Sequence, residues 1–214
     1  MSTAESGWDA YRAAMFGDPY LVWHEGVDLT ALAATTGAAR EEAVRMLLVG
    51  LRAGDPVAAQ GLRELRPVEA VPALREAAEP GREPGLRVRA AQALLSLTGD
   101  QDWARPVADV LDSTAEFWGV RIDAAAALRD FAPTPALVAA LVRAAQDPEY
   151  LVRYHASSTL LAYAGRKRDV SAYRRWFPRL AAPPAGTAPT DEHRAAWQTV
   201  AGELAAAVPV APAG

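Results

Sequence analysis

The sequence predicts an all-α fold, an α-solenoid in which helix hairpins stack in a row. The first observation is a nine-residue pattern with three copies: LRVRAAQAL at 86–94, VRIDAAAAL at 120–128 and VRYHASSTL at 152–160. Successive copies are 34 and 32 residues apart. The second observation is that apolar residues within each copy recur at spacings of three and four, the period of a helix and not of a strand. Repeats of this length bury their apolar face only by stacking on their neighbours.

Residues 1–37 lie outside the repeat and are predicted to form a capping segment. This segment is rich in aromatic residues, namely Trp8, Tyr11, Phe16, Tyr20 and Trp23, and ends in a short helix from Leu29 to Thr36 with Asp28 as its cap. A stacked array needs an atypical terminal unit to cover its last apolar face. We therefore favour capping over ligand stacking as the role of these aromatic residues.

Residues 38–165 are predicted to form four hairpins. A fourth copy of the pattern lies one period earlier, in DPVAAQGL, where Asp55 takes the place of the arginine. Asp-Pro pairs at 55–56 and 147–148 mark helix starts, and Gly54, Gly99 and Gly165 mark helix ends. A shorter helix precedes each of the three full copies, and its start is indicated by Pro72, Pro106 and Pro135.

Residues 166–214 are predicted to form a divergent C-terminal repeat. A short helix is expected from Asp169 to Leu180, and a Pro-rich loop follows at 181–189. The last helix is expected from Thr190, its N-cap, to Val208, and the residues after it are expected to be frayed.

Four features of the repeating unit together resemble the HEAT repeat, particularly the bacterial phycobilisome-lyase-type HEAT-like repeats. They are a proline-containing first helix, an acidic turn, the VR..A...L pattern and a terminal glycine. The resemblance covers 55–165 well and 38–210 loosely. It implies that the second helix of each hairpin lines a concave face. It also implies a ladder in which Arg87, Arg121 and Arg153 meet acidic residues of the turns, with Asp147 or Glu116 as partners. Asp55 departs from this pattern in the first copy.

Composition argues against several classes of function. The chain has no cysteine, and its three histidines lack metal-ligand spacing, so no metal site is predicted. Nucleotide-binding loops and hydrolase motifs are absent from the sequence, and neither a catalytic residue nor a cofactor is predicted. Residues 1–150 hold 22 acidic and 14 basic side chains, which disfavours nucleic acid as the main partner. The first thirty residues show no secretory signal or membrane helix, so we expect a cytoplasmic protein without a membrane partner.

The stripe that would line the concave groove is unusually apolar and lightly charged. It consists of Val88, Gln92, Leu95, Trp118, Ile122, Asp123, Arg129, Tyr154, His155, Ser158 and Leu161. Exposed apolar grooves typically bind a partner helix or peptide. The sequence therefore favours a non-catalytic adaptor, regulatory or inhibitory protein that holds a protein or peptide partner. A terminal element folded over the groove is the alternative.

Two other interpretations stay open. HEAT-fold alkylpurine DNA glycosylases and small-molecule lyases share the architecture, and an enzyme of this kind would use Trp118, Asp123, Tyr154 and His155. A basic patch combined with Tyr173, Trp176 and Phe177 is also compatible with nucleic-acid binding; it comprises Arg166, Lys167, Arg168, Arg174, Arg175 and Arg179. The helical spacing of its apolar residues favours instead a buried face with solvated arginines.

Overall fold

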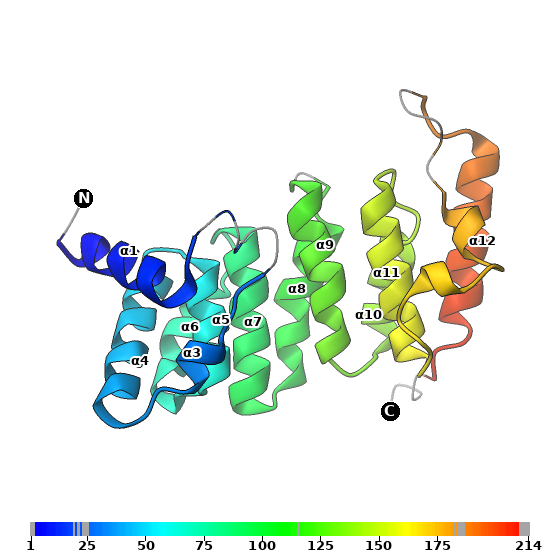
Figure 1. Ribbon diagram of the computed structural model, residues 1–214. Helices are drawn as coiled ribbons and strands as arrows, with labels where there is room; N and C mark the ends of the chain where they lie inside the picture. Colours follow the sequence, from blue (N-terminus) through cyan, green and yellow to red (C-terminus); the bar gives the residue numbers. More distant parts are fainter. Residues whose placement is uncertain are drawn as a thin grey trace. The chain divides into compact units, whose positions relative to one another are not determined.

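The computed structural model describes residues 3–18, 20, 22, 26–114, 116–181, 183 and 187–209. Every regular element in these ranges is a helix, which confirms the all-α prediction (Figure 1). Trp23, part of the Pro-rich loop and the last five residues lie outside the described residues. The chain divides into two compact units, residues 1–106 and 107–214, and each is described by itself.

Unit 1 is built from two helix hairpins and an N-terminal cap. The hairpins are α4–α5 and α6–α7, and in the packing of the unit α4 contacts α6 while α5 contacts α7. The elements are α1 (Thr3–Phe16), α3 (Thr30–Ala33), α4 (Gly37–Arg52), α5 (Pro56–Leu65), the 3-10 helix η1 (Val68–Ala70), α6 (Val71–Ala77), α7 (Pro84–Thr98) and the 3-10 helix η2 (Gln101–Trp103). Helix α8 (Ala104–Asp112) begins in unit 1 and continues into unit 2.

The repeat register forms the core of both units. In unit 1 the side chains of Ala58, Leu62, Ala90 and Leu94 have no exposed surface. Their counterparts in unit 2 are equally buried, namely Ala124, Leu128, Ala156 and Leu160. The three glycines predicted at helix ends all have positive φ, as a left-handed C-terminal residue requires.

Asp55 joins the N-terminal cap to the first full hairpin. One carboxylate oxygen of Asp55 accepts hydrogen bonds from the indole Nε1 of Trp8 at 3.1 Å and from Nε of Arg12 at 2.7 Å. The other oxygen accepts from the backbone N–H of Val57 and caps α5. The residue that departs from the arginine pattern is thus the one that binds α1. Trp8 and Phe16 are buried, whereas Tyr20 is exposed.

The contact of α1 with α4 requires a glycine at position 50. A Cβ atom at Gly50 would clash with the indole ring of the buried Trp8. We expect Gly50→Ala to lower the free energy of unfolding by about 2 kcal/mol, because a rigid fused ring must move out of a packed site. Urea denaturation followed by circular dichroism measures the change. Gly202→Ala on α12 is the control, because nothing lies within 4 Å of its Cβ position and it should be neutral or stabilising. Equal effects of both variants would contradict the packing argument.

Unit 2 consists of a helix layer closed by the C-terminal segment. Helix α11 contacts α9, α10 and α12, and α12 also contacts the 3-10 helix η5. The elements are α9 (Trp118–Ala127), the 3-10 helix η3 (Leu128–Asp130), α10 (Pro135–Ala144), α11 (Tyr150–Tyr163), the 3-10 helices η4 (Val170–Ala172) and η5 (Phe177–Leu180), and α12 (Asp191–Ala205).

The helix expected from Asp169 to Leu180 is replaced by the two short 3-10 helices η4 and η5. The Asp169 side chain accepts from the backbone N–H of Ser171 and closes a tight turn. Pro178, which has no N–H, lies in η5. The apolar spacing still describes burial well, because Val170, Trp176 and Leu180 are buried although the backbone between them is not a continuous helix. Thr190 caps α12 as expected, and its hydroxyl accepts from the N–H of His193.

Candidate functional site

The α7 part of the predicted groove is polar. Val88 has no exposed surface and Gln92 is 5% exposed, so only Leu95 presents an apolar side chain in part to the surface. A pocket of about 420 Å³ opens between α5 and α7, here called the α5–α7 pocket. Its walls are formed by Leu29, Gln60, Arg63, Glu64, Arg66, Arg89, Gln92 and Ser96. At α7 the predicted stripe therefore borders an arginine-rich pocket and not an apolar surface.

Two hydrogen bonds place the arginines of the α5–α7 pocket. Nη2 of Arg66 donates to the backbone carbonyl of Ser96 at 2.7 Å. Nη1 of Arg89 donates to Oε1 of Gln92 at 3.1 Å. Arg66 is the C-cap of α5 and has φ 53° and ψ 46°, a left-handed conformation. The sequence stripe included Gln92 but left out Arg89, which has the register of Asp123 and His155, and Arg63, which has the register of Leu95; Arg66 lies outside that register.

The α11 part of the predicted groove is covered by the C-terminal segment. The hydroxyl of Tyr154 donates to Oδ1 of Asp169 at 2.7 Å, and the N–H of Val170 donates to Oγ of Ser158 at 3.4 Å. Leu161 and Ser158 are buried. The hydrogen bond to Asp169 raises the pKa of Tyr154, so this phenol acts as a hydrogen-bond donor that holds η4. At α11 a terminal segment thus folds over the predicted groove, which is the alternative to an open groove.

His155 is half-buried, and its charged neighbours are the cationic Arg129 and the anionic Asp123. Burial lowers its pKa, the guanidinium of Arg129 lowers it further, and the carboxylate of Asp123 opposes both effects. The ring of Tyr154 packs edge-on against the imidazole, with 5.3 Å between ring centroids. The structure therefore brings together three predicted site residues from α9, η3 and α11, and it keeps the histidine neutral at neutral pH.

This environment predicts a pH dependence of stability. A histidine whose pKa is lowered in the folded state stabilises the fold fully above its unfolded pKa of about 6.5. The stabilisation is lost as the pH falls from there through the folded pKa, because the unfolded chain binds more protons. We expect the free energy of unfolding to fall below that pH with a slope of at most about 1.4 kcal/mol per pH unit from this group. Urea titrations of the wild type and of His155→Gln measure it. An identical acid slope in both proteins would contradict the assignment.

Unit 2 exposes an apolar edge at the start of two neighbouring helices. Phe117 is 64% exposed, Trp118 40% and Leu151 41%, and the rings of Phe117 and Trp118 lie 4.8 Å apart. Hydrogen bonds from Thr159 to the Ala125 carbonyl of α9 and from Tyr163 to the Leu128 carbonyl of η3, which follows α9 directly, have sequence offsets of 34 and 35.

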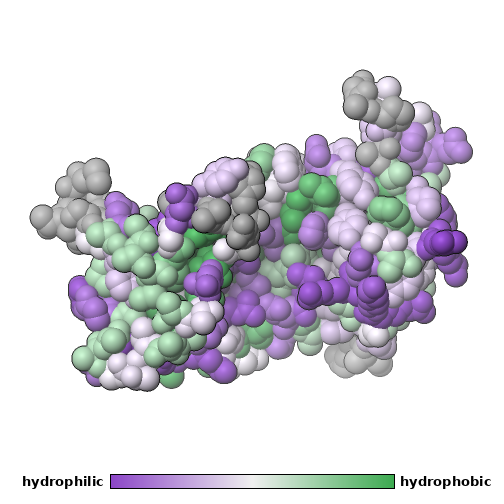
Figure 2. Space-filling view, in the orientation of Figure 1, coloured by the Kyte–Doolittle hydropathy of each residue, from purple (hydrophilic) through white to green (hydrophobic). Residues whose placement is uncertain are grey.

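The two helices therefore run parallel, and Phe117, Trp118 and Leu151 all lie at the start of one or the other. Figure 2 shows hydrophobic side chains at the surface over the upper part of α9. We call Phe117, Trp118 and Leu151 the aromatic edge. The sequence stripe contained Trp118 but missed Phe117 and Leu151, since both lie outside the repeat register. The EFW triplet before the second copy of the pattern was the available signal.

The basic C-terminal patch is partly neutralised within the chain. Glu203 accepts from the indole Nε1 of Trp176 at 2.9 Å and forms ion pairs with Arg175 at 2.8 Å and Arg179 at 3.2 Å. Trp176 is buried and lies beneath the guanidinium of Arg166. Its ring thus packs inside the unit, as expected for a buried face. The remaining members, Lys167, Arg168 and Arg174, are exposed.

The three arginines of the predicted ladder have three different environments. Arg121 forms a buried ion pair with Asp147. Arg153 is fully buried, with its guanidinium 3.7 Å from the Trp197 ring centroid. The buried Nε of Arg87 has no hydrogen-bond partner among the residues that the structure describes. Asp147, one of the two acidic residues expected as partners at the turns, therefore pairs with Arg121.

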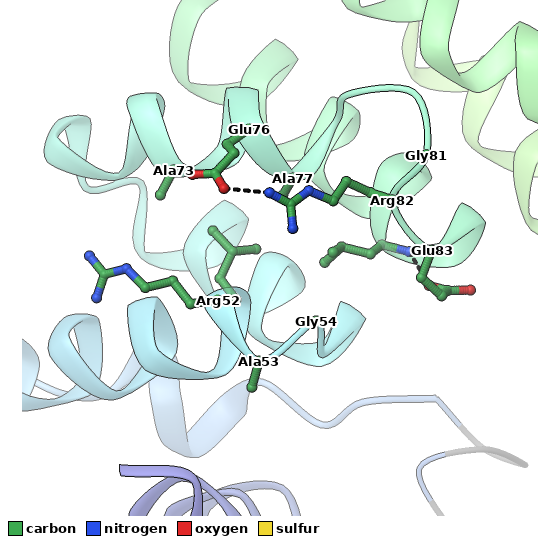
Figure 3. A pocket seen from close by; sticks show the side chains of 11 residues that line it. Arg52, Ala53, Gly54, Ala73, Glu76, Ala77, Gly81, Arg82 and Glu83 are labelled. Atoms are coloured by element: carbon green, nitrogen blue, oxygen red, sulfur yellow. Dashed lines mark hydrogen bonds and ion pairs between the residues drawn. The ribbon is translucent and has the colours of Figure 1, made fainter. Parts of the chain in front are cut away.

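A second pocket in unit 1, of about 350 Å³, lies where α4 ends beside α6 and the α6–α7 loop. In Figure 3, Arg82 reaches across to Glu76, with which it forms an ion pair. Glu83 accepts from the backbone N–H groups of Gly85 and Leu86 and so caps α7. Arg82, Glu76 and Glu83 therefore stabilise the loop between α6 and α7 through these contacts.

In the described part of the chain, no group of three or more His, Asp or Glu side chains is placed to hold a metal ion. Among the same residues, no helix combines the length and the apolar character needed to cross a membrane. The chain has no match among protein-family models, curated proteins or solved structures.

Proposed function

We propose that the protein is a non-catalytic adaptor whose HEAT-like hairpins stack as a solenoid and whose partner is a protein or a peptide. Packing within each unit supports this proposal. The second helices α5 and α7 pack side by side in unit 1, and α9 and α11 do so in unit 2. The alanine and leucine positions that all four copies share are fully buried. Stacking of second helices on one another is the packing that an α-solenoid uses.

The observation that carries the binding function is the aromatic edge. Fully burying a Phe or Leu side chain is worth about 1.5–3 kcal/mol, so three large apolar side chains that are each at least 40% exposed leave part of that stabilisation unrealised in the free protein. Aromatic side chains, Trp above all, are enriched among the residues that dominate binding energy at protein interfaces. Ile122, half-buried one turn further along α9, extends the edge toward the predicted groove. The partner would pack its own apolar side chains against these residues.

Affinity capture with a matched set of variants tests the proposal. The double variant Phe117→Asp/Trp118→Asp places two charges on the aromatic edge. Val68→Asp is the control, because Val68 is 75% exposed and belongs to unit 1. Tyr154 is left unchanged, because its substitution would release Asp169 and disturb η4.

Proteins captured from the native host are identified by mass spectrometry. A partner retained by the wild type and by Val68→Asp, but lost with the double variant, is the expected result. A partner retained equally by all three proteins would contradict the assignment of the aromatic edge. Helical circular dichroism of each variant shows whether its fold is intact.

A further inference from the structure

The aromatic edge is flanked by two carboxylates. Glu116 directly precedes Phe117, and Glu149 directly precedes the first residue of α11. Among the residues that the structure describes, neither side chain forms a hydrogen bond or an ion pair. Glu149 is exposed and is the N-cap of α11, but its side chain does not bond to the backbone N–H groups of that helix. Both carboxylates are therefore available to a partner at the start of the two helices.

The other charged side chains of segments 112–121 and 147–153 are engaged within the protein. Most of them belong to two ion pairs, Asp112–Arg143 and Arg121–Asp147. Arg153 attracts Glu149 through space, but its guanidinium is fully buried and donates to backbone carbonyls. Unit 2 as a whole is neutral, because residues 107–214 hold 11 acidic and 11 basic side chains. The negative charge beside the aromatic edge is therefore a local feature.

Contacts within unit 2 hold the aromatic edge in place. The Phe117 ring lies 2.7 Å from the position that a Cβ atom at residue 119 would take, so the glycine there leaves room for it. The carboxylate of Asp147 pairs with Arg121 on α9 and accepts from the backbone N–H of Glu149 at 2.9 Å, which ties the start of α11 to α9. A surface that is formed in advance loses little conformational entropy when it binds.

We propose that the aromatic edge binds a peptide segment in which Lys or Arg flanks a large apolar side chain. This inference rests on the proposed binding function of the aromatic edge and names the chemistry of its partner. The apolar side chain packs against Phe117, Trp118 and Leu151, which lose exposed apolar surface. The cation pairs with Glu116 or Glu149, and the face of a Trp ring attracts a cation as well.

Size and charge disfavour other occupants of the aromatic edge. Its three side chains expose on the order of 300 Å², because a whole aromatic side chain has about 150–250 Å² of surface. An interface with a second copy of the chain needs about 800 Å² on each partner. Two edges packed against each other would also bring carboxylates of like charge together. Nucleic acid is repelled for the same reason. A short segment that is basic and apolar fits both constraints.

Fluorescence anisotropy with two labelled peptides tests the inference. Both peptides carry two Leu residues; each Leu is flanked by Lys in one peptide and by Gln in the other. We expect the Lys peptide to bind about tenfold more tightly at low salt, and the difference to shrink as salt is added. Equal affinities would overturn the inference while leaving binding at the aromatic edge intact. Failure of the Lys peptide to bind would overturn it as well, and the capture experiment would still judge the proposed function.

Two double variants locate the charge effect. Glu116→Gln/Glu149→Gln should weaken the Lys peptide about tenfold, to the affinity of the Gln peptide, and should leave the Gln peptide unchanged. Glu79→Gln/Glu192→Gln is the matched control, because both side chains are exposed and lie outside segments 112–121 and 147–153. This control should bind both peptides like the wild type. Equal losses in the two double variants would overturn the assignment of the carboxylates.

Phe117→Ala/Trp118→Ala separates this inference from the proposed function. It removes the two rings and keeps both carboxylates, so both peptides should bind at least about tenfold more weakly. Unchanged binding of the Lys peptide would place the basic segment elsewhere and overturn the inference. Analytical ultracentrifugation addresses the second copy as an occupant. Self-association of the wild type that this variant abolishes would also overturn the inference, whereas a monomer is the expected result.

Discussion

Replacement of Arg153 by methionine is expected to lower the free energy of unfolding by about 3 kcal/mol, because several buried carbonyls lose their donors. The guanidinium of Arg153 donates to the carbonyls of Asp147 at 2.6 Å, Pro148 at 2.8 Å and Leu180 at 3.1 Å. Its planar face also lies 3.7 Å from the Trp197 ring centroid. Methionine matches much of the volume but supplies no donor. Urea denaturation followed by circular dichroism measures the loss.

Arg194→Met is the matched control for this substitution. Arg194 is an exposed arginine on α12 that also donates to a backbone carbonyl, that of Pro189, and pairs with Asp191. An exposed pair is worth about 0–1 kcal/mol, so this variant should be nearly as stable as the wild type. Similar losses in both variants would contradict the view that Arg153 joins α11 to the C-terminal segment.

Arg121→Met is expected to cost a similar amount, about 3 kcal/mol, for a different reason, since it leaves a buried carboxylate without its cation. Only 8% of the Arg121 side chain and 6% of the Asp147 side chain are exposed in this ion pair. The guanidinium also donates from Nε to the carbonyl of Leu111 at 3.2 Å. The midpoint of urea denaturation reports the change.

A second Arg–Asp pair in the same unit provides the comparison. Arg143 and Asp112 are joined at 2.6 Å, but 60% and 37% of their side chains are exposed. Arg143→Met should therefore cost less than about 1 kcal/mol. Adding Asp147→Asn to Arg121→Met should recover part of the loss, because the unpaired charge is removed. If Arg121→Met and Arg143→Met lowered the free energy of unfolding equally, burial of the Arg121–Asp147 pair would add nothing to its contribution to stability.

The helical elements could be read from the sequence because they depend on local patterns. Ala124 and Leu128 repeat the register of Ala90 and Leu94, and all four side chains are fully buried. Thr190 could be recognised as an N-cap, since capping involves only the residues of the following turn. Segment 169–180 was the largest exception. Its apolar spacing is helical, yet Asp169 and Pro178 favour separate turns, and Trp176 is held by Glu203 on α12. In addition, α12 ends at Ala205 and not at Val208, and the N-cap of α11 is Glu149 and not Asp147.

The candidate sites were less predictable because they depend on contacts between distant residues. Tyr154 and Ser158 were placed in the concave groove, and whether a terminal element covers that groove was left open; Asp169 and Val170 return to cover them. Periodicity along α11 contains no information about that return. The α5–α7 pocket was missed because the stripe was traced only through the three full copies of the pattern and left out α5, where Arg63 has the register of Leu95. The aromatic edge lies just outside the repeat register, where pattern matching gives no weight to Phe117.

Photo-cross-linking in the native host tests the central claim, partner binding at the aromatic edge, most directly. Benzoyl-phenylalanine replaces Phe117 in one protein and Val68, an exposed apolar residue of unit 1, in another. After irradiation, cross-linked proteins are purified and identified by mass spectrometry. We expect one partner to be cross-linked from position 117 and not from position 68. Equal cross-linking from both positions, or none from 117 while the same partner is still captured, would contradict the proposal.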